Sequence, residues 1–248
     1  MILWTENHLK TLLPSLIIMA IASVVLRKCL KDKSEKIRLI PLQVIAVILV
    51  VLEIFKQVIS FTKGYDLYHI PLHFCSLFIF FYPLAAFYKG KYKESIRAFT
   101  SAIAFALFLL MTIYPDLIYS GNNIANTFKH FFDFHTVAFH TVATFGAFVI
   151  VSLDLHQPET KKDAKNIYIM LFVYCLVAGV VSQILKTNYN NFYHCNVPPL
   201  ENLRVSVVSV LGGFGQALYV VVVTIADFAF VTGAYWLYRG IRKLFQKI

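Results

Sequence analysis

Charged residues are scarce in this chain of 248 residues, and acidic ones are scarcer than basic ones. Asp, Glu, Lys and Arg make up 15% of the chain, with 13 acidic against 23 basic side chains, while 58% of its residues are hydrophobic and its mean hydropathy is +0.67. The alternating ten-residue segments of a lipid-facing β-barrel are missing as well. A soluble domain has no use for so much apolar surface, so these shortages predict an all-α, polytopic membrane protein.

The apolar runs predict a bundle of seven transmembrane helices in one domain that covers residues 1–248. A spanning helix takes about 20 mainly apolar residues. The runs cover residues 11–26, 39–60, 70–88, 96–114, 131–153, 167–186 and 211–238. The last run is longer than one span needs, and the glycines in 211–215 are expected to precede its helix or to break it.

Basic residues predict the orientation, because cytoplasmic loops collect Lys and Arg. Seventeen of the 23 lie in the segments 27–38, 89–97, 161–165 and 239–247, and only five lie in the alternate segments. The N-terminus is therefore expected outside and the C-terminus in the cytoplasm. This topology explains the net charge of +10, which is no argument for nucleic-acid binding.

Polar side chains within the apolar runs gather toward the outer side. The stretch His-Ile-Pro-Leu-His-Phe-Cys-Ser, residues 69–76, opens the third run, and Pro71 suits the first turn of a helix. Polar and ionisable residues in a membrane usually line a cavity or pathway. The candidate members of an outward-facing site are Gln57, His69, His73, Cys75, Ser76, His135, His140, Asn188 and Tyr189.

Helical spacing suggests which of these residues act together. His69 and His73 are four residues apart and share a face of a regular helix, whereas His73 and Cys75 differ by about 200°. If Cys75 is a nucleophile, its base should come from another helix, and His135 is expected at a matching depth. His73 would then orient the site or bind a polar head group.

Each of these features also has a purely structural interpretation. Cys75 can be a packing residue, the histidines can sit at a polar interface, and Glu53 with Lys56 can form a structural i, i+3 pair. Asp227 stands alone in the last run and needs a partner, so its structural and functional interpretations stay open. Four scattered cysteines make no disulfide framework.

The sequence predicts no metal site and no cofactor. Only His69 and His73 have the i, i+4 spacing that helix-borne ligands prefer, with a third ligand possible from His135 or His140. The chain has no glycine-rich phosphate loop after a strand and no Gly-x-Ser-x-Gly elbow.

A family resemblance rests on the same residues. The segment Pro-Leu-His-Phe-Cys-Ser at 71–76, the histidines that open the fifth run, and Thr-Asn-Tyr at 187–189 resemble the YwaF-like integral membrane family, which extends to the eukaryotic transmembrane protein 164 acyltransferases. The resemblance implies acyl transfer between lipids by a cysteine paired with a histidine on a later helix. By motif the cysteine is Cys75, and the histidine is His135. The segment 190–196 departs from the family pattern.

The sequence therefore favours a thiol-dependent lipid acyltransferase or lipid-ester hydrolase, with membrane lipids as partners and a bacterial plasma membrane as its location. A small-solute transporter and a non-enzymatic membrane scaffold are the alternatives. A cavity closed on the cytoplasmic side would favour the enzyme, a continuous polar path the transporter, and a filled bundle the scaffold. The lipid, the acceptor and the oligomeric state are left open by the sequence.

Overall fold

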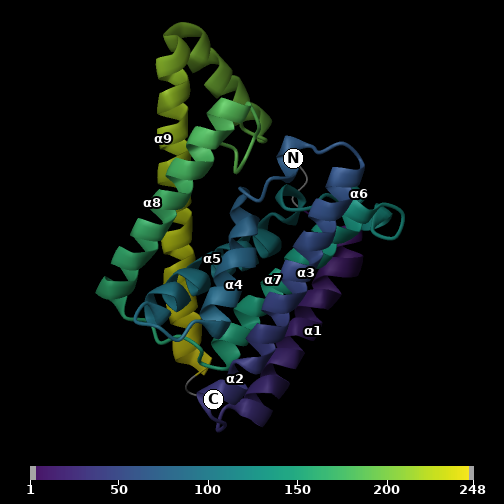
Figure 1. Ribbon diagram of the computed structural model, residues 1–248, viewed down its shortest axis with the longest axis vertical. Coiled ribbons are helices and arrows are strands. Elements are labelled where there is room, and N and C mark those ends of the chain that lie inside the picture. The colour runs from purple at the N-terminus through teal and green to yellow at the C-terminus, as the bar shows by residue number, and fades with distance from the viewer. Residues whose placement is uncertain (1–3, 246–248) are drawn as a thin grey trace.

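A computed structural model describes residues 4–245 as an arrangement of helices and short turns, with no strand in that range (Figure 1). The elements in chain order are α1 (Glu6–Leu30), α2 (Glu35–Arg38), α3 (Ile40–Thr62), the 3-10 turns η1 (Leu67–His69) and η2 (Phe74–Ser76), α4 (Leu77–Phe87), α5 (Lys93–Ile113), η3 (Pro115–Leu117), α6 (Gly121–Asn126), α7 (Phe131–Ser152), α8 (Thr160–Leu185) and α9 (Pro198–Phe245). The prediction of an all-α membrane protein is confirmed at this level.

Six helices are long and apolar enough to cross a membrane: α1, α3 with α2, α5, α7, α8 and α9. The third predicted run is represented by a shorter apolar helix, Phe74–Phe87. The count of seven spans therefore remains a prediction. Lys247, counted with the basic tail, lies outside the described residues.

Helix α5 is the centre of the bundle. It packs against α4, α7, α8 and α9, and it is the most buried of the six candidate spans. Its small residues Ala98, Ala102 and Ala106 are fully buried, which allows neighbouring helices to approach closely. In Figure 1, α8 and α9 lie on one side of α4 and α5, and α1, α3 and α7 lie on the other.

The two ends of the bundle differ in charge. At one end, Asp154 accepts hydrogen bonds from Arg27 (3.4 Å) and Arg242 (3.1 Å), which joins the last turns of α1 and α9 to the segment after α7. Arg97 of α5 lies 2.8 Å from Glu35 of α2 at the same end. We call this the basic end. The opposite end holds the first turn of α1, and we call it the cavity end.

The prediction of a helix from residue 70 is wrong. Residues 63–76 form the two separate turns η1 and η2, and α4 begins only at Leu77. Pro71 disfavours helical geometry at the residue before it, and Ile70 is extended with φ −57° and ψ 132°, so the turn η1 ends there. The Asp66 side chain caps η1 by accepting from the Tyr68 backbone N–H at 2.9 Å.

The last predicted run is broken where the sequence indicated, but it begins earlier. Gly212 has φ 56° and ψ −134°, a conformation open to glycine, and it divides α9 into a short arm from Pro198 and a long arm to Phe245. Pro198 and Pro199 start the short arm rather than break the chain, since proline suits the first helical positions. The irregular connection between α8 and α9 is therefore residues 186–197.

Two short helices were not predicted. Helix α2 lies in the first basic loop, and α6 begins at a Ser120–Asn123 capping box. A Ser three residues before an amide is a recognisable start signal, but six residues carry too little periodicity to support it.

Candidate functional site

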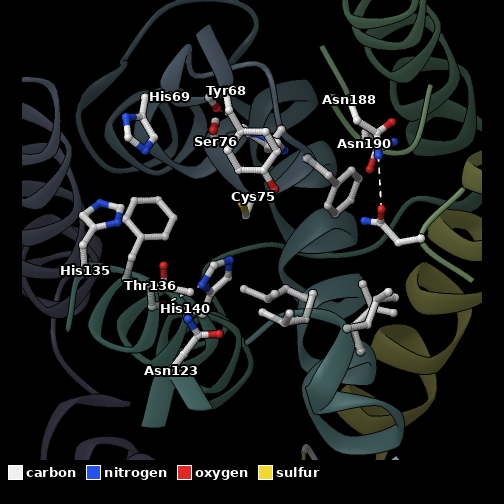
Figure 2. A pocket seen from close by; sticks show the side chains of 18 of the residues that line it. Tyr68, His69, Cys75, Ser76, Asn123, His135, Thr136, His140, Asn188 and Asn190 are labelled. Carbon is white, nitrogen blue, oxygen red and sulfur yellow. Dashed lines mark hydrogen bonds between the residues drawn. The ribbon is translucent and has the colours of Figure 1, made fainter. Parts of the chain in front are cut away.

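A cavity of about 390 Å³ opens at the cavity end (Figure 2). Its walls come from α3, the segment with η1 and η2, α5, α6, α7, the connection 186–197 and the long arm of α9. Of the predicted site residues, those that line it are Glu53, Lys56, His69, His73, Cys75, Ser76, His135, His140, Asn188 and Asp227. The structure thus brings most of the predicted set into one place.

Gln57 and Tyr189 do not line the cavity, but they form hydrogen bonds to the segments that make its walls. Gln57 donates to the Glu53 carboxylate and to the His69 carbonyl, both at 2.7 Å. Tyr189 is completely buried and its hydroxyl donates to the Leu67 carbonyl, which fastens the connection 186–197 to η1. Both residues are positioning groups in this arrangement.

The two histidines of the segment 69–76 lie in different parts of the cavity wall and have different partners. His69 Nδ1 lies 2.6 Å from the Ser60 hydroxyl, and its ring stacks on Phe132 of α7. Burial lowers the pKa of His69 below the ordinary value. His73 Nε2 instead donates to the Tyr68 carbonyl at 3.0 Å. The expectation that His69 and His73 share a helix face is wrong, because Pro71 separates them into different turns.

Cys75 lies in η2, between the irregular segment and the start of α4. It is half-buried, and its side chain projects toward the space that His140 approaches from the opposite wall (Figure 2). Ser76 beside it is buried. In this view His135 lies farther toward α3 than His140 does.

The two α7 histidines differ in how their ring nitrogens are used. His140 Nδ1 lies 2.7 Å from the Thr136 carbonyl, which can only accept, so Nδ1 carries the proton and Nε2 of the neutral ring is an acceptor. His135 Nε2 is buried with no hydrogen-bond partner in the described structure, and it lies 3.7 Å from a Glu53 carboxylate oxygen. The His135 ring stacks on Phe139, with centroids 5.4 Å apart.

Glu53 is the electrostatic centre of the α3 wall. Its carboxylate pairs with Lys56 Nζ at 2.9 Å and accepts from Gln57, and both members of the pair are largely buried. The predicted i, i+3 pair is therefore present. A buried carboxylate with both a cation and an amide donor is compensated for its loss of water.

Asp227 has the partner that the sequence required. Asn190 Nδ2 donates to its Oδ2 at 2.7 Å, and the Cys175 thiol lies 3.8 Å from the same oxygen. Cys175 is buried in the core and also contacts this carboxylate. The interaction with Asn190 ties the connection 186–197 to the middle of the long arm of α9.

Apart from Asn188, sequence reasoning missed the amide side chains of the cavity. Asn123, Asn190, Asn191 and Asn196 also line it, as do Tyr68, Thr136 and Phe139. The signal was present in part: Asn190 and Asn191 both have positive φ, 50° and 62°, a conformation that Asn adopts more readily than most residues. A run of asparagines between two apolar helices therefore marked a folded turn rather than a loose loop.

Comparison with known proteins gives a family and no further relative. No curated protein and no solved structure matches the chain. A family model, described as the TMEM164 family, matches residues 3–236, the range that contains the segment 69–76, both α7 histidines, the asparagine-rich connection and Asp227. With so much of its length matched, cavity included, the chain belongs to the TMEM164 family.

Proposed function

We propose that this membrane protein transfers or hydrolyses lipid acyl esters, with Cys75 as its nucleophile and a histidine of α7 as its base. One observation carries the proposal: Cys75, His135 and His140 line the same cavity, which also has apolar walls from Leu107, Leu110 and Phe230. A thiol, a base and an apolar surface in one space are what a lipid ester requires. The acyl chain would lie against the apolar wall.

The orientation predicted from the basic loops belongs to this proposal. The basic end faces the cytoplasm, the cavity end faces outward, and α4 with its preceding turn counts as the seventh span. The meeting of the last turns of α1 and α9 at Asp154, together with the basic residues around them, supports this assignment.

The chemistry needs only groups that the cavity holds. The histidine accepts the Cys75 thiol proton, and the thiolate attacks the ester carbonyl carbon. The alkoxide leaves with the proton that the imidazolium returns, and the acyl group remains as a thioester on Cys75. An acceptor hydroxyl or water then loses its proton to the histidine and attacks the thioester, which restores the thiol.

Either of the two α7 histidines can act as the base. The hydrogen bonds around them favour His140, whereas the motif favours His135. His140 has an accepting Nε2, since its Nδ1 is bound to the Thr136 carbonyl. His135 directs its Nε2 toward Glu53. We assign the base to His140, with His135 as the competing assignment that the family resemblance favours.

A transporter is supported less well, because the polar lining does not continue toward the basic end. Between Leu107 and Arg97, α5 contributes the buried apolar side chains Phe99, Ile103 and Phe105. The buried Thr100 and Ser101 hydroxyls in this stretch donate to carbonyls of their own helix. A scaffold requires a filled bundle and leaves the cavity without a role.

The test is acyl exchange by the purified protein in lipid nanodiscs, with a phospholipid of labelled acyl chain and a lysophospholipid acceptor. Cys75→Ala should abolish both the transferred and the hydrolysed product. Cys195→Ala is the matched control, since Cys195 is also half-buried but does not line the cavity, and it should keep the activity. Full activity in Cys75→Ala would overturn the nucleophile assignment.

The same assay distinguishes the two candidate bases. Loss of a general base lowers the rate roughly 10²–10⁴-fold. The rate of His140→Asn should fall by this factor, while the rate of His135→Asn should fall less. The reverse order would return the base to His135, and a thiol-reactive ester probe should lose labelling of Cys75 in whichever variant lacks the base.

A further inference from the structure

The two arms of α9 form an apolar hairpin at the cavity end. The arms meet at Gly212, and Figure 1 shows the bend at the top of the molecule, beyond the ends of the other helices. Gly215 makes the hairpin tight: a Cβ there would lie 2.9 Å from the Val207 carbonyl oxygen. Because that neighbour is backbone of the opposite arm, the close approach depends on glycine.

The outer surface of this hairpin is apolar. At its tip, Val210 is 80% exposed and Phe214 is 70% exposed, and Leu203 on the short arm is 61% exposed. No charged residue occurs from Val205 to Ala226. Side chains of this kind placed in water would form a large unfavourable patch.

The charged pair and the serines of the short arm have hydrogen-bond partners within the hairpin. Arg204 pairs with Glu201 at 2.7 Å and donates to Gln216 of the long arm at 2.8 Å, so its charge faces the space between the arms. The exposed Ser206 and Ser209 hydroxyls donate to backbone carbonyls of their own helix at 2.9 and 2.8 Å. These three side chains need no water to complete the hydrogen bonds described, as lipid burial requires.

Helix length fixes the depth of the hairpin. From Gly213 to Trp236 the long arm rises about 35 Å at 1.5 Å per residue, slightly more than the 30 Å of a bilayer's hydrocarbon. Trp236, with Arg239 over its ring, fits the interface at the basic end. The tip of the hairpin then reaches the opposite interface, and Asp227 lies about 20 Å below the tip.

We propose that the α9 hairpin is embedded in the outer leaflet and that lipid chains cover its exposed face. The connection 186–197 lies along the long arm. The Asn190 side chain donates a hydrogen bond to Asp227, and the Tyr219 hydroxyl donates one to the Asn191 carbonyl. The cavity that this connection lines therefore lies at the depth of the hydrocarbon, beneath the tip. This position does not depend on any catalytic chemistry.

Quenching of an added tryptophan by lipids brominated on their acyl chains tests the proposal. Phe214→Trp places the reporter at the hairpin tip, and Phe128→Trp is the matched control, since Phe128 is 96% exposed in the segment between α6 and α7. The signal of native Trp4 and Trp236 is removed by comparison with the parent protein in the same nanodiscs.

The added tryptophan at 214 should be quenched by brominated lipid and shielded from iodide, whereas that at 128 should show the opposite pattern. Iodide quenching at 214 without lipid quenching would place the tip in water and overturn the proposal. Shielding from both quenchers, with crosslinking of two copies through an introduced Val210→Cys, would also overturn it, because protein and not lipid would then cover the hairpin.

Discussion

Removal of Lys56 gives the sharpest test of the electrostatics around the cavity. Glu53 is about nine-tenths buried, and Lys56 Nζ at 2.9 Å is the only Lys or Arg that the described structure places within ion-pair distance of it. Lys56→Met keeps the apolar stem and leaves the carboxylate with Gln57 and His135. Breaking a buried pair in this way costs about 3–5 kcal/mol of unfolding free energy.

A loss of that size should lower the melting temperature of the protein in detergent by roughly 6–20 °C, by the scaling for chains of this length. The lower half of this range is expected, because Gln57 still donates to the carboxylate at 2.7 Å. Lys10→Met is the matched control: Lys10 also pairs with an acidic residue of its own helix, Glu6, but both side chains are largely exposed. Exposed pairs contribute little, so its melting temperature should hardly move.

The double variant Glu53→Gln, Lys56→Met separates a pair from two independent residues. Neutralising both members removes the buried charge and keeps the acceptor for Gln57, so part of the lost stability should return. If the two single changes add within about 0.5 kcal/mol, the residues are not coupled and the reasoning is refuted.

Three further predictions concern other parts of the molecule. At the basic end, burial alone would lower the pKa of His156, but Asp163 at 3.0 Å and Glu94 at 3.5 Å outweigh it and hold the pKa above the ordinary value. The stability that protonated His156 supplies should be complete below about pH 6.5 and should be lost as the pH rises through its folded pKa; a melting series against pH should show this slope, and His156→Gln should flatten it. Gly146→Ala would place a Cβ 2.3 Å from the buried Tyr82 hydroxyl, which donates to the Ala143 carbonyl, and should cost about 1–3 kcal/mol, while Gly233→Ala, with nothing within 4 Å, should be tolerated; equal melting temperatures would contradict the packing. For topology, an impermeant thiol reagent applied to intact cells should label a cysteine introduced at Phe128, which is 96% exposed, and miss one at Lys162, and the opposite pattern would reverse the proposed sides.

The long helices were predictable because lipid imposes a simple rule on composition. Runs such as 39–60 and 131–153 lie within about two residues of α3 and α7. Helix α5, predicted at 96–114, begins three residues earlier at Lys93. Charge placement and apolar length carry this information without any knowledge of contacts.

The residues that line the cavity were predictable in part, but their geometry was not. Cys75, His73 and the α7 histidines do line one cavity, yet the regular helix expected through 70–76 is two turns separated by Pro71. Proline at a first helical turn and proline in an irregular segment look the same in sequence. What decides between them is tertiary: the Leu67 carbonyl is bound by Tyr189, a partner far along the chain.

The contribution of Asn190 was not predictable for a related reason. Its side chain matters because Asp227 lies opposite, and no local pattern joins two positions on different segments. The departure of residues 190–196 from the family pattern marked the segment as unusual without saying that it forms a cavity wall.

The bond between Tyr189 and Leu67 spans 122 positions of sequence, and this separation sets an order on biogenesis. Synthesis proceeds from the N-terminus, so Cys75 enters the membrane while the segment that will close its surroundings is still unmade. Until residue 189 emerges, the turns around Cys75 lack the tie that holds them, and until Asp227 follows, the asparagine wall lacks its anchor. If Cys75 is the nucleophile proposed above, a site completed this late keeps its thiol from acting on the lipids around a half-made chain.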